Sequence, residues 1–214
     1  EGLENIFAHR MLLEKPPHVR RAQSETDADW MQIEQVIRQI IKHTPATKHV
    51  RNARPRLSRM FTRPISRVEG YDISNISGQE ATGSMVVFIN GRPDSSQYRM
   101  FGIKTVHGPN DVAMHREVIR RRMNHPEWPY PDLMVIDGGK PQLNAALSQL
   151  PASHFPLPTK ELFVVALAKR EEELYVPERE KPIRLDSVPR PVKHFFQHVR
   201  DESHRFAKKY HHKR

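Results

Sequence analysis

Two aspartates follow short apolar stretches, where their carboxylates could share a metal ion. Asp137 ends the run 132–136 and is followed by two glycines, and Asp72 lies within another strand-like stretch, 68–74. Hard divalent cations prefer carboxylate oxygens, and neighbouring carboxylates repel each other unless a cation lies between them. Such a cation can activate a water and stabilise the leaving oxygen when a phosphodiester is hydrolysed. The pair therefore indicates metal-dependent cleavage of nucleic acid, although Asp72 alone could cap a turn and Asp137 alone the helix after it.

A histidine and a third aspartate are further candidates for the same site. His204 lies on a predicted basic helix, eight residues after Phe196, so it can point at the edge of the sheet. Its imidazole could bind a metal or move a proton near neutral pH, and Asp201, one turn earlier, could orient it. Asp111 lies in the first turn of another predicted helix, where an acidic residue suits the helix dipole with or without a function. Asp111 therefore stays open between a metal ligand, a supporting residue and a helix-stabilising one.

The chain is strongly basic, which favours a polyanionic partner. Its 35 lysines and arginines against 25 acidic residues give a formal net charge of +10 and a pI of about 10.0. Such a charge favours nucleic acid first and an anionic membrane surface second. The predicted phosphate contacts are the basic residues beside the aspartates, after a predicted strand and on the last helix: Lys140, Lys169, Arg170, Arg205, Lys208 and Lys209.

The composition also excludes several classes of protein. There is no cysteine, so disulfides and thiolate-held zinc or iron–sulfur sites are excluded. No apolar run reaches the length of a membrane span, and the first residues lack a signal-peptide pattern. We therefore expect a soluble, cytoplasmic protein with no membrane partner.

The first 63 residues differ from the rest of the chain. Apolar residues at helical spacing predict one amphipathic helix over 29–42. The stretch 48–67 is basic, has no acidic residue and is interrupted by prolines, which indicates an arm that contacts DNA or a merely solvated linker. We expect residues 1–63 to form this helical and basic arm, and residues 64–214 to form the globular domain.

The globular part is predicted to be α/β. Asn90-Gly91 between two apolar runs predicts a hairpin turn, because both residues accept a positive φ. An antiparallel meander followed by strand–helix alternation predicts a mixed five-stranded sheet with helices on both faces, as in the RNase H-like fold. In that fold the first and fourth strands are parallel neighbours, which would place Asp72 and Asp137 side by side at the carboxyl edge of the sheet. The expected strands are 67–73, 81–89, 97–103, 132–137, 162–168 and a short 173–176, and the expected helices are 111–123, 141–150 and 191–210.

Four stretches, in order along the chain, carry a resemblance to a known family. They are VEGYDISNISG (68–78), DLMVIDGGKPQL (132–143), ALAKREEEL (166–174) and RDESHRFAKKY (200–210). The part of the chain that contains them, about residues 66–214, resembles the C-terminal endonuclease domain of UvrC, the incision subunit of bacterial nucleotide excision repair.

This resemblance implies an activity, a cofactor and partners. The domain would have an RNase H-like fold and would cut damaged double-stranded DNA on the 5′ side of a lesion, with Mg²⁺ or Mn²⁺ as the cofactor. Asp72, Asp137 and His204 would be both the catalytic set and the metal ligands, and Asp111 would be an additional acidic position. UvrB would be a protein partner, and UvrA would act through the repair complex.

The chain departs from the family pattern at several points. Val112 stands where an aromatic residue usually follows the helical acid. Neither a GIY-YIG nuclease domain nor a helix–hairpin–helix pair is found, and a UvrB-binding segment is not evident. We therefore expect one nuclease domain of a longer or naturally short protein, without full dual incision.

Two other functions stay open on the same residues. A nuclease for RNA–DNA hybrids or branched DNA would use the same carboxylates. A non-catalytic DNA-binding fragment would retain the fold, with a metal site that is idle.

Overall fold

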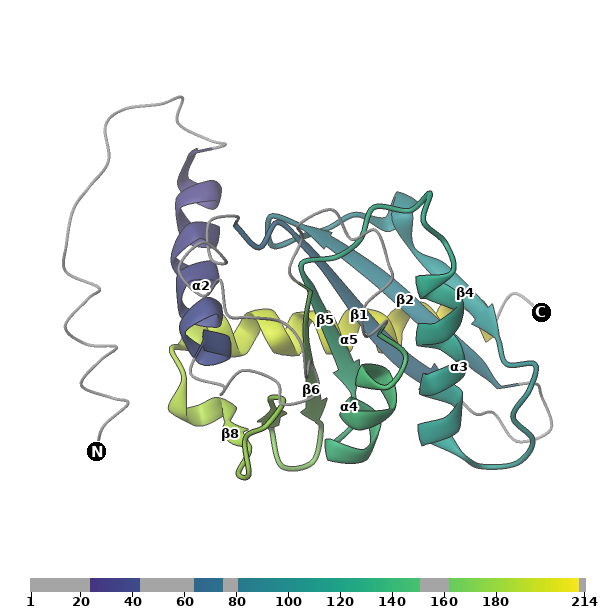
Figure 1. Ribbon diagram of the computed structural model, residues 1–214. Coiled ribbons are helices and arrows are strands. Elements are labelled where there is room, and N and C mark those ends of the chain that lie inside the picture. Colours follow the sequence, from purple (N-terminus) through teal and green to yellow (C-terminus); the bar gives the residue numbers. More distant parts are fainter. Residues whose placement is uncertain (1–23, 43–63, 75–80, 151–161, 212–214) are drawn as a thin grey trace, which may run out of the picture.

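A mixed β-sheet with helices on both faces forms the centre of the computed structural model, which describes residues 24–42, 64–74, 81–150 and 162–211 (Figure 1). None of the helices in these ranges has the length and apolar content of a membrane span. The helices are α2 (Ser24–Lys42), α3 (Asp111–Met123), α4 (Lys140–Leu147) and α5 (Arg190–His211). The strands are β1 (Arg67–Ser74), β2 (Thr82–Ile89), β3 (Arg92–Pro93), β4 (Arg99–Gly102), β5 (Leu133–Asp137), β6 (Phe163–Ala168), β7 (Glu173–Tyr175) and β8 (Ile183–Arg184).

Parallel pairing at the centre of the sheet determines where the two aspartates lie. The strand order is β3-β2-β1-β5-β6-β7-β8, and β4 also pairs with β2. The pairs β1–β5 and β5–β6 are parallel, and the remaining pairs are antiparallel. Because Tyr71 pairs with Ile136, the residues that follow them, Asp72 and Asp137, lie on neighbouring parallel strands. The predicted pairing of the first and fourth long strands is confirmed.

The long elements agree with the sequence prediction, and the short ones differ. Each predicted helix is present, and α2 begins at Ser24, five residues before the predicted start at Asp29. The sheet has eight described strands, and three of them have only two or three residues: β3, β7 and β8. The other five correspond to the five longer strands of the prediction. Strands β3 and β8 were not predicted, because two residues show no periodicity.

The predicted third strand, 97–103, is shorter than expected and follows a 3₁₀ turn. Asn90 (φ +49°) and Gly91 (φ +77°) form the predicted hairpin turn, but this turn leads into β3 and not into β4. The Asp94 carboxylate accepts a hydrogen bond, 3.2 Å long, from the backbone amide two residues later. Such local bonds compete with the ladder between strands, so the chain turns before β4 begins at Arg99.

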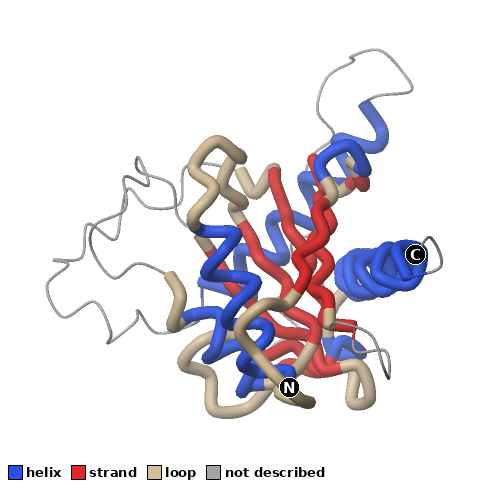
Figure 2. Tube along the Cα trace, turned by 90° about the vertical axis from the view of Figure 1, so that its right-hand side faces the viewer, coloured by secondary structure: helices blue, strands red, loops and turns tan. Residues whose placement is uncertain are grey.

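Different helices cover the two faces of the sheet (Figure 2). α5 packs against β1, β2 and β5 on one face, and α3 and α4 cover the other. Side chains of β1 alternate between these faces: Gly70 faces Val199 of α5, whereas Glu69 faces Arg122 of α3. The apolar face of α5 is the predicted one, with Val192, Phe195, Phe196 and Val199 buried and Phe206 packed against the core.

A buried ionic cluster joins β1 to α3. Glu69 is fully buried and accepts hydrogen bonds from Arg67, from Arg122 and from the Tyr71 hydroxyl. Burial, together with the Glu69 charge, raises the pKa of Tyr71 well above its usual value, so the phenol stays a protonated donor. Removing one charge would leave the others buried and uncompensated, so the cluster fixes α3 against the sheet.

α2 packs on α5 and on the segment before β1. The buried Trp30 ring lies 4.9 Å from the Phe195 ring between centroids, and its Nε1 donates a 3.1 Å hydrogen bond to the Ile65 carbonyl. Its ring also lies over the hairpin turn, where a Cβ on Gly91 would come within 2.5 Å of it. The domain boundary at residue 63 stays a prediction, and most of the predicted basic arm lies outside the described residues.

Substitution of Trp30 tests whether α2 belongs to the cooperative folding unit. We expect Trp30→Ala to lower the free energy of unfolding by about 3–5 kcal/mol, because it removes a buried aromatic side chain. The neighbouring Met31 is 62% exposed, so Met31→Ala should change the same quantity by less than about 0.5 kcal/mol. Urea denaturation of both variants measures the difference, and equal stabilities would show that α2 is an appendage.

Candidate functional site

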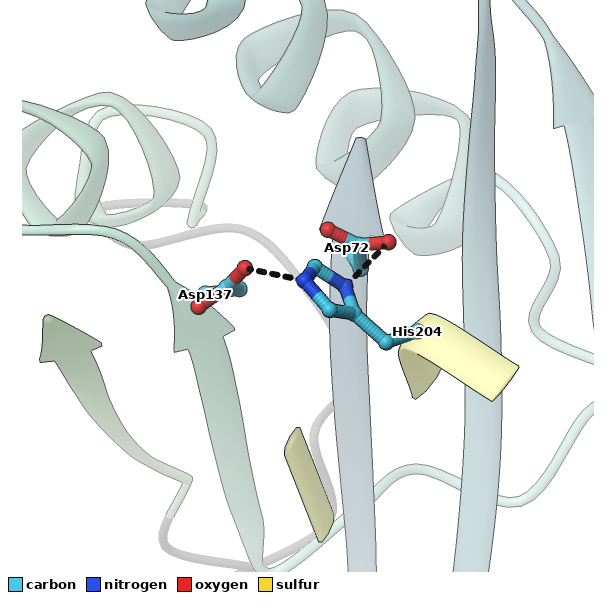
Figure 3. Close-up of side chains that lie close together, drawn as sticks. All are labelled: Asp72, Asp137 and His204. Atoms are coloured by element: carbon cyan, nitrogen blue, oxygen red, sulfur yellow. Dashed lines mark ion pairs between the residues drawn. The ribbon is translucent and has the colours of Figure 1, made fainter. Parts of the chain in front are cut away.

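Three side chains from separate elements converge near the carboxyl ends of the central parallel strands (Figure 3). Asp72 lies on β1, Asp137 ends β5 and His204 lies on α5. One ligand atom from each lies within 4.8 Å of the other two, and no other group of three acidic or histidine side chains in the described ranges is this close. The structure thus brings together the three residues that the sequence analysis selected.

The imidazole lies between the two carboxylates (Figure 3). Nδ1 of His204 is 2.9 Å from Oδ2 of Asp72, and Nε2 is 3.9 Å from Oδ2 of Asp137. The Asp72 side chain is 5% exposed, whereas those of Asp137 and His204 are 17% and 29% exposed. A ligand would therefore reach the site from the side of Asp137 and His204.

The surroundings of Asp137 disfavour its ionised form. Burial, and after it the charge of Asp72, raises the pKa of Asp137 to about 6. A hydrogen bond with Asp72 raises the pKa of His204, although burial acts in the opposite direction. The two carboxylates therefore favour the protonated form of the imidazole that lies between them.

The donor set fits a divalent cation. Carboxylate oxygens suit Mg²⁺ and Mn²⁺, and an imidazole nitrogen is accepted by many divalent metals. Burial and the charge of Asp72, which raise the pKa of Asp137, both disfavour its ionised form. A cation at this position would favour the ionised form, so these residues fit a metal site.

Asp72, and not Asp201, orients the imidazole of His204. The expectation for Asp201 was wrong: its carboxylate is 63% exposed and lies 3.0 Å from Arg200. Arg200 also reaches Glu172, in the loop after β6, at 2.7 Å. The helical position of Asp201 directs it at solvent, so the contact that holds the ring comes from a strand.

Asp111 lies outside the three-residue group and is linked to the loop that follows Asp137. Its carboxylate accepts a 3.0 Å hydrogen bond from Gln142, whose side-chain oxygen accepts a 3.1 Å bond from the Gly139 amide. Burial alone would raise the pKa of Asp111, but hydrogen bonds from His115 and Gln142 bring it below its usual value. Asp111 thus supports this loop, and its role as a metal ligand stays a prediction.

His115, on α3, is a buried polar residue that the sequence analysis missed. Its Nδ1 lies 3.0 Å from the Asp111 carbonyl oxygen, and its buried Nε2 has no hydrogen-bond partner among the described residues. It lies close enough to Asp137 to influence the pKa of that carboxyl, in the lowering direction. The chain has 13 histidines, and nothing in the spacing of this one sets it apart.

Three predicted phosphate contacts lie at the carboxyl side of the sheet. Lys140 begins α4, three residues after Asp137, and Lys169 and Arg170 follow directly after β6. All three are exposed. Lys169 lies close enough to His204 for its charge to oppose the rise in the pKa of that imidazole.

The other predicted phosphate contacts follow His204 on α5. Lys208 and Lys209 are exposed on the last described turns of the helix. Arg205 is also exposed, but its guanidinium is already paired with Glu202 at 2.6 Å. Whether these basic residues contact DNA stays a prediction.

Comparison with known proteins identifies relatives that carry the same region. Residues 58–207 match the family described as the UvrC RNAse H endonuclease domain. The UvrABC system protein C of Dictyoglomus thermophilum is 51% identical over 152 residues, which are 70% of this chain and 24% of that protein. The protein of the same name from Methanothermobacter thermautotrophicus is 47% identical over 145 residues, 68% of this chain and 24% of that protein. The chain thus spans about a quarter of the length of these relatives.

Two endonuclease V structures are distant matches. Endonuclease V of Ciona intestinalis, in complex with DNA that contains an inosine, shares 15% sequence identity with a TM-score of 0.38. The match covers 87% of this chain and 69% of that one. Human endonuclease V gives a TM-score of 0.32 at 16% identity, over 72% of this chain and 63% of that one. Likenesses this weak support no conclusion about the site.

The raised pKa of Asp137 predicts a stability that depends on pH. At a pH between the usual pKa of an aspartate and about 6, Asp137 keeps a proton in the folded protein that it releases in the unfolded chain. The stability of the fold therefore falls as the pH rises through this window. Asp137→Asn removes this penalty, and in a chelator at about pH 7.5 we expect its Tm to exceed that of the wild type by about 3–8 °C. The gain in Tm should vanish near about pH 4, where residue 137 is uncharged in the folded wild type as well as in the folded variant.

A matched control for this measurement is Asp29→Asn, which neutralises an exposed aspartate on α2. Its Tm should follow the wild-type curve at every pH. A Tm of Asp137→Asn below that of the wild type above pH 6 would show that Asp137 stabilises the fold in its ionised form.

Proposed function

The chain belongs to the UvrC RNase H endonuclease domain family, and we propose that it hydrolyses a phosphodiester of damaged double-stranded DNA on the 5′ side of a lesion, in nucleotide excision repair. The observation that supports this most strongly is the convergence of Asp72, Asp137 and His204 at one edge of the sheet. Family membership alone would indicate the fold. The convergence adds side chains able to perform the hydrolysis.

We propose that Asp72 and Asp137 hold Mg²⁺ or Mn²⁺, with His204 as a third ligand or as the residue that moves a proton. A divalent cation bound there would activate water and stabilise the charge on the leaving oxygen. Asp72 would also orient His204, because its Oδ2 accepts a hydrogen bond from Nδ1 of the imidazole. That bond directs Nε2 toward Asp137 and the more exposed side of the site, where a proton can be taken up or released.

The basic residues around the site would bind the DNA backbone. Lys140, Lys169 and Arg170 lie on the same side of the sheet as the carboxylates and can approach phosphates near the cut bond. Lys208 and Lys209 extend this basic surface along α5. Arg205, which is exposed and paired with Glu202, would also contact the DNA backbone. Such contacts place a duplex without reading its sequence.

UvrB, and UvrA through the repair complex, are the proposed protein partners. The support is the name shared by the relatives, UvrABC system protein C. Because this chain spans about a quarter of those proteins, their whole activity is not assigned to it.

Removal of either carboxylate tests the proposed function. We expect Asp72→Ala and Asp137→Ala to lower the nicking rate on a lesion-containing duplex by more than about 100-fold, since residues that only support metal ligands already cost about 10–100-fold. DNA affinity should survive, because the phosphate contacts are separate residues. Chelation should abolish nicking by the wild type, and Mn²⁺ or Mg²⁺ should restore it.

Asp201→Asn is the matched control, because it neutralises an exposed aspartate one turn from His204 without touching the group. It should nick at nearly the wild-type rate. Nicking by both alanine variants at that rate would refute the site. Preferential cutting of an RNA–DNA hybrid or a four-way junction would keep the chemistry and replace the repair substrate.

A further inference from the structure

We infer that Ser84 is a positioning residue, whose hydroxyl holds α5 at the place on the sheet where His204 reaches Asp72. The inference rests on the proposed function, since it concerns how the same site is assembled. Ser84 lies on β2, whereas Asp72 lies on β1 and His204 on α5.

The hydroxyl of Ser84 joins the backbone beside Asp72 to the backbone beside His204. Ser84 is fully buried and pairs directly with Asp72 in the β1–β2 register. Its Oγ donates to the carbonyl oxygen of Ser203 at 3.1 Å, and the Asp72 carbonyl oxygen lies at 3.5 Å. The bond therefore ends one residue from His204, and starts from the strand beside Asp72.

The helix approaches the sheet closely one turn earlier. A Cβ on Gly70 would lie 2.5 Å from Cγ1 of Val199 and 3.4 Å from its carbonyl oxygen. Val199 and Ser203 are four residues apart, so they lie on the same face of α5. Because Gly70 has no side chain, α5 can lie close to the backbone of β1. The hydroxyl of Ser84 adds a directional contact at the next turn of the helix.

Apolar packing alone would fix the position of the helix less well. Burial of apolar surface is non-directional, so it favours contact without specifying a small shift along the sheet. Two other polar contacts of α5, from Arg200 to Glu172 and from Tyr98 to Glu202, use long side chains that can follow such a shift. Ser84 is short and buried, and its bond reaches backbone rather than a flexible side chain.

Two variants of Ser84 separate the hydrogen bond from the packing. Ser84→Ala removes the donor, and Ser84→Cys keeps an atom at the γ position with a weaker donor. We expect each to lower kcat for nicking and the affinity for Mn²⁺ alone by about 10-fold, the lower end of the effect of residues that support metal ligands. The KM for DNA should stay unchanged.

Ser66→Ala is the matched control. Its hydroxyl also makes a 3.1 Å bond, to Asp132 at the opposite end of β1 from the site. This variant should lose comparable stability and retain wild-type kcat and Mn²⁺ affinity.

A measurement without metal or DNA distinguishes this inference from the proposed function. In chelated protein, the ¹⁵N signals of the His204 ring report the Nδ1 contact with Asp72. We expect these signals to change in both Ser84 variants and to stay as in the wild type in Ser66→Ala. Unchanged ring signals and Mn²⁺ affinity in the Ser84 variants would overturn the inference, whereas nicking by both Asp72→Ala and Asp137→Ala at the wild-type rate would overturn the proposed function.

Discussion

Repulsion between two carboxylates on neighbouring parallel strands is the constraint on which the site depends. The register of β1 and β5 places Asp72 beside Asp137, and burial with this repulsion raises the pKa of Asp137 to about 6. Positive charge has to lie between them for both to be ionised. Protonation of His204, which both carboxylates favour, would provide it in the metal-free protein, so α5 would compensate charge as well as pack on the core. A divalent cation would take over this role.

The fold holds this unfavourable pair by using the two faces of β1 differently. On one face, the buried Arg122 of α3 donates to Glu69, which Arg67 of the same strand also contacts, and this cluster resists movement of the strand. On the other face, Gly70 admits α5 close to the backbone, so that the helix delivers His204 to the site. Alternation of side chains along one strand thus separates the stabilising contacts from the chemistry. Functional sites commonly reduce stability in this way, and contacts elsewhere offset it.

The sequence was sufficient for elements and residues whose signals are periodic or local. The long strands and helices, the turn at Asn90-Gly91 and the adjacency of Asp72 and Asp137 were all predicted and are confirmed. The 3₁₀ turn that shortens the third strand depends on side-chain hydrogen bonds of Asp94, which apolar periodicity does not register. The choice of Asp72 over Asp201 as the partner of His204 depends on how α5 lies on the sheet, a contact between distant segments.

Placement of the site also separates how the domain would cut from where it would cut. Asp72, Asp137 and His204 all lie within residues 58–207, the part that matches the family, so the geometry of the cluster belongs to this domain. The surrounding lysines and arginines favour any phosphate backbone, and such contacts carry no information about sequence or lesions. In the proposed repair function, selection of a lesion would therefore have to come from contacts outside the cluster, and the proposed partners would supply them.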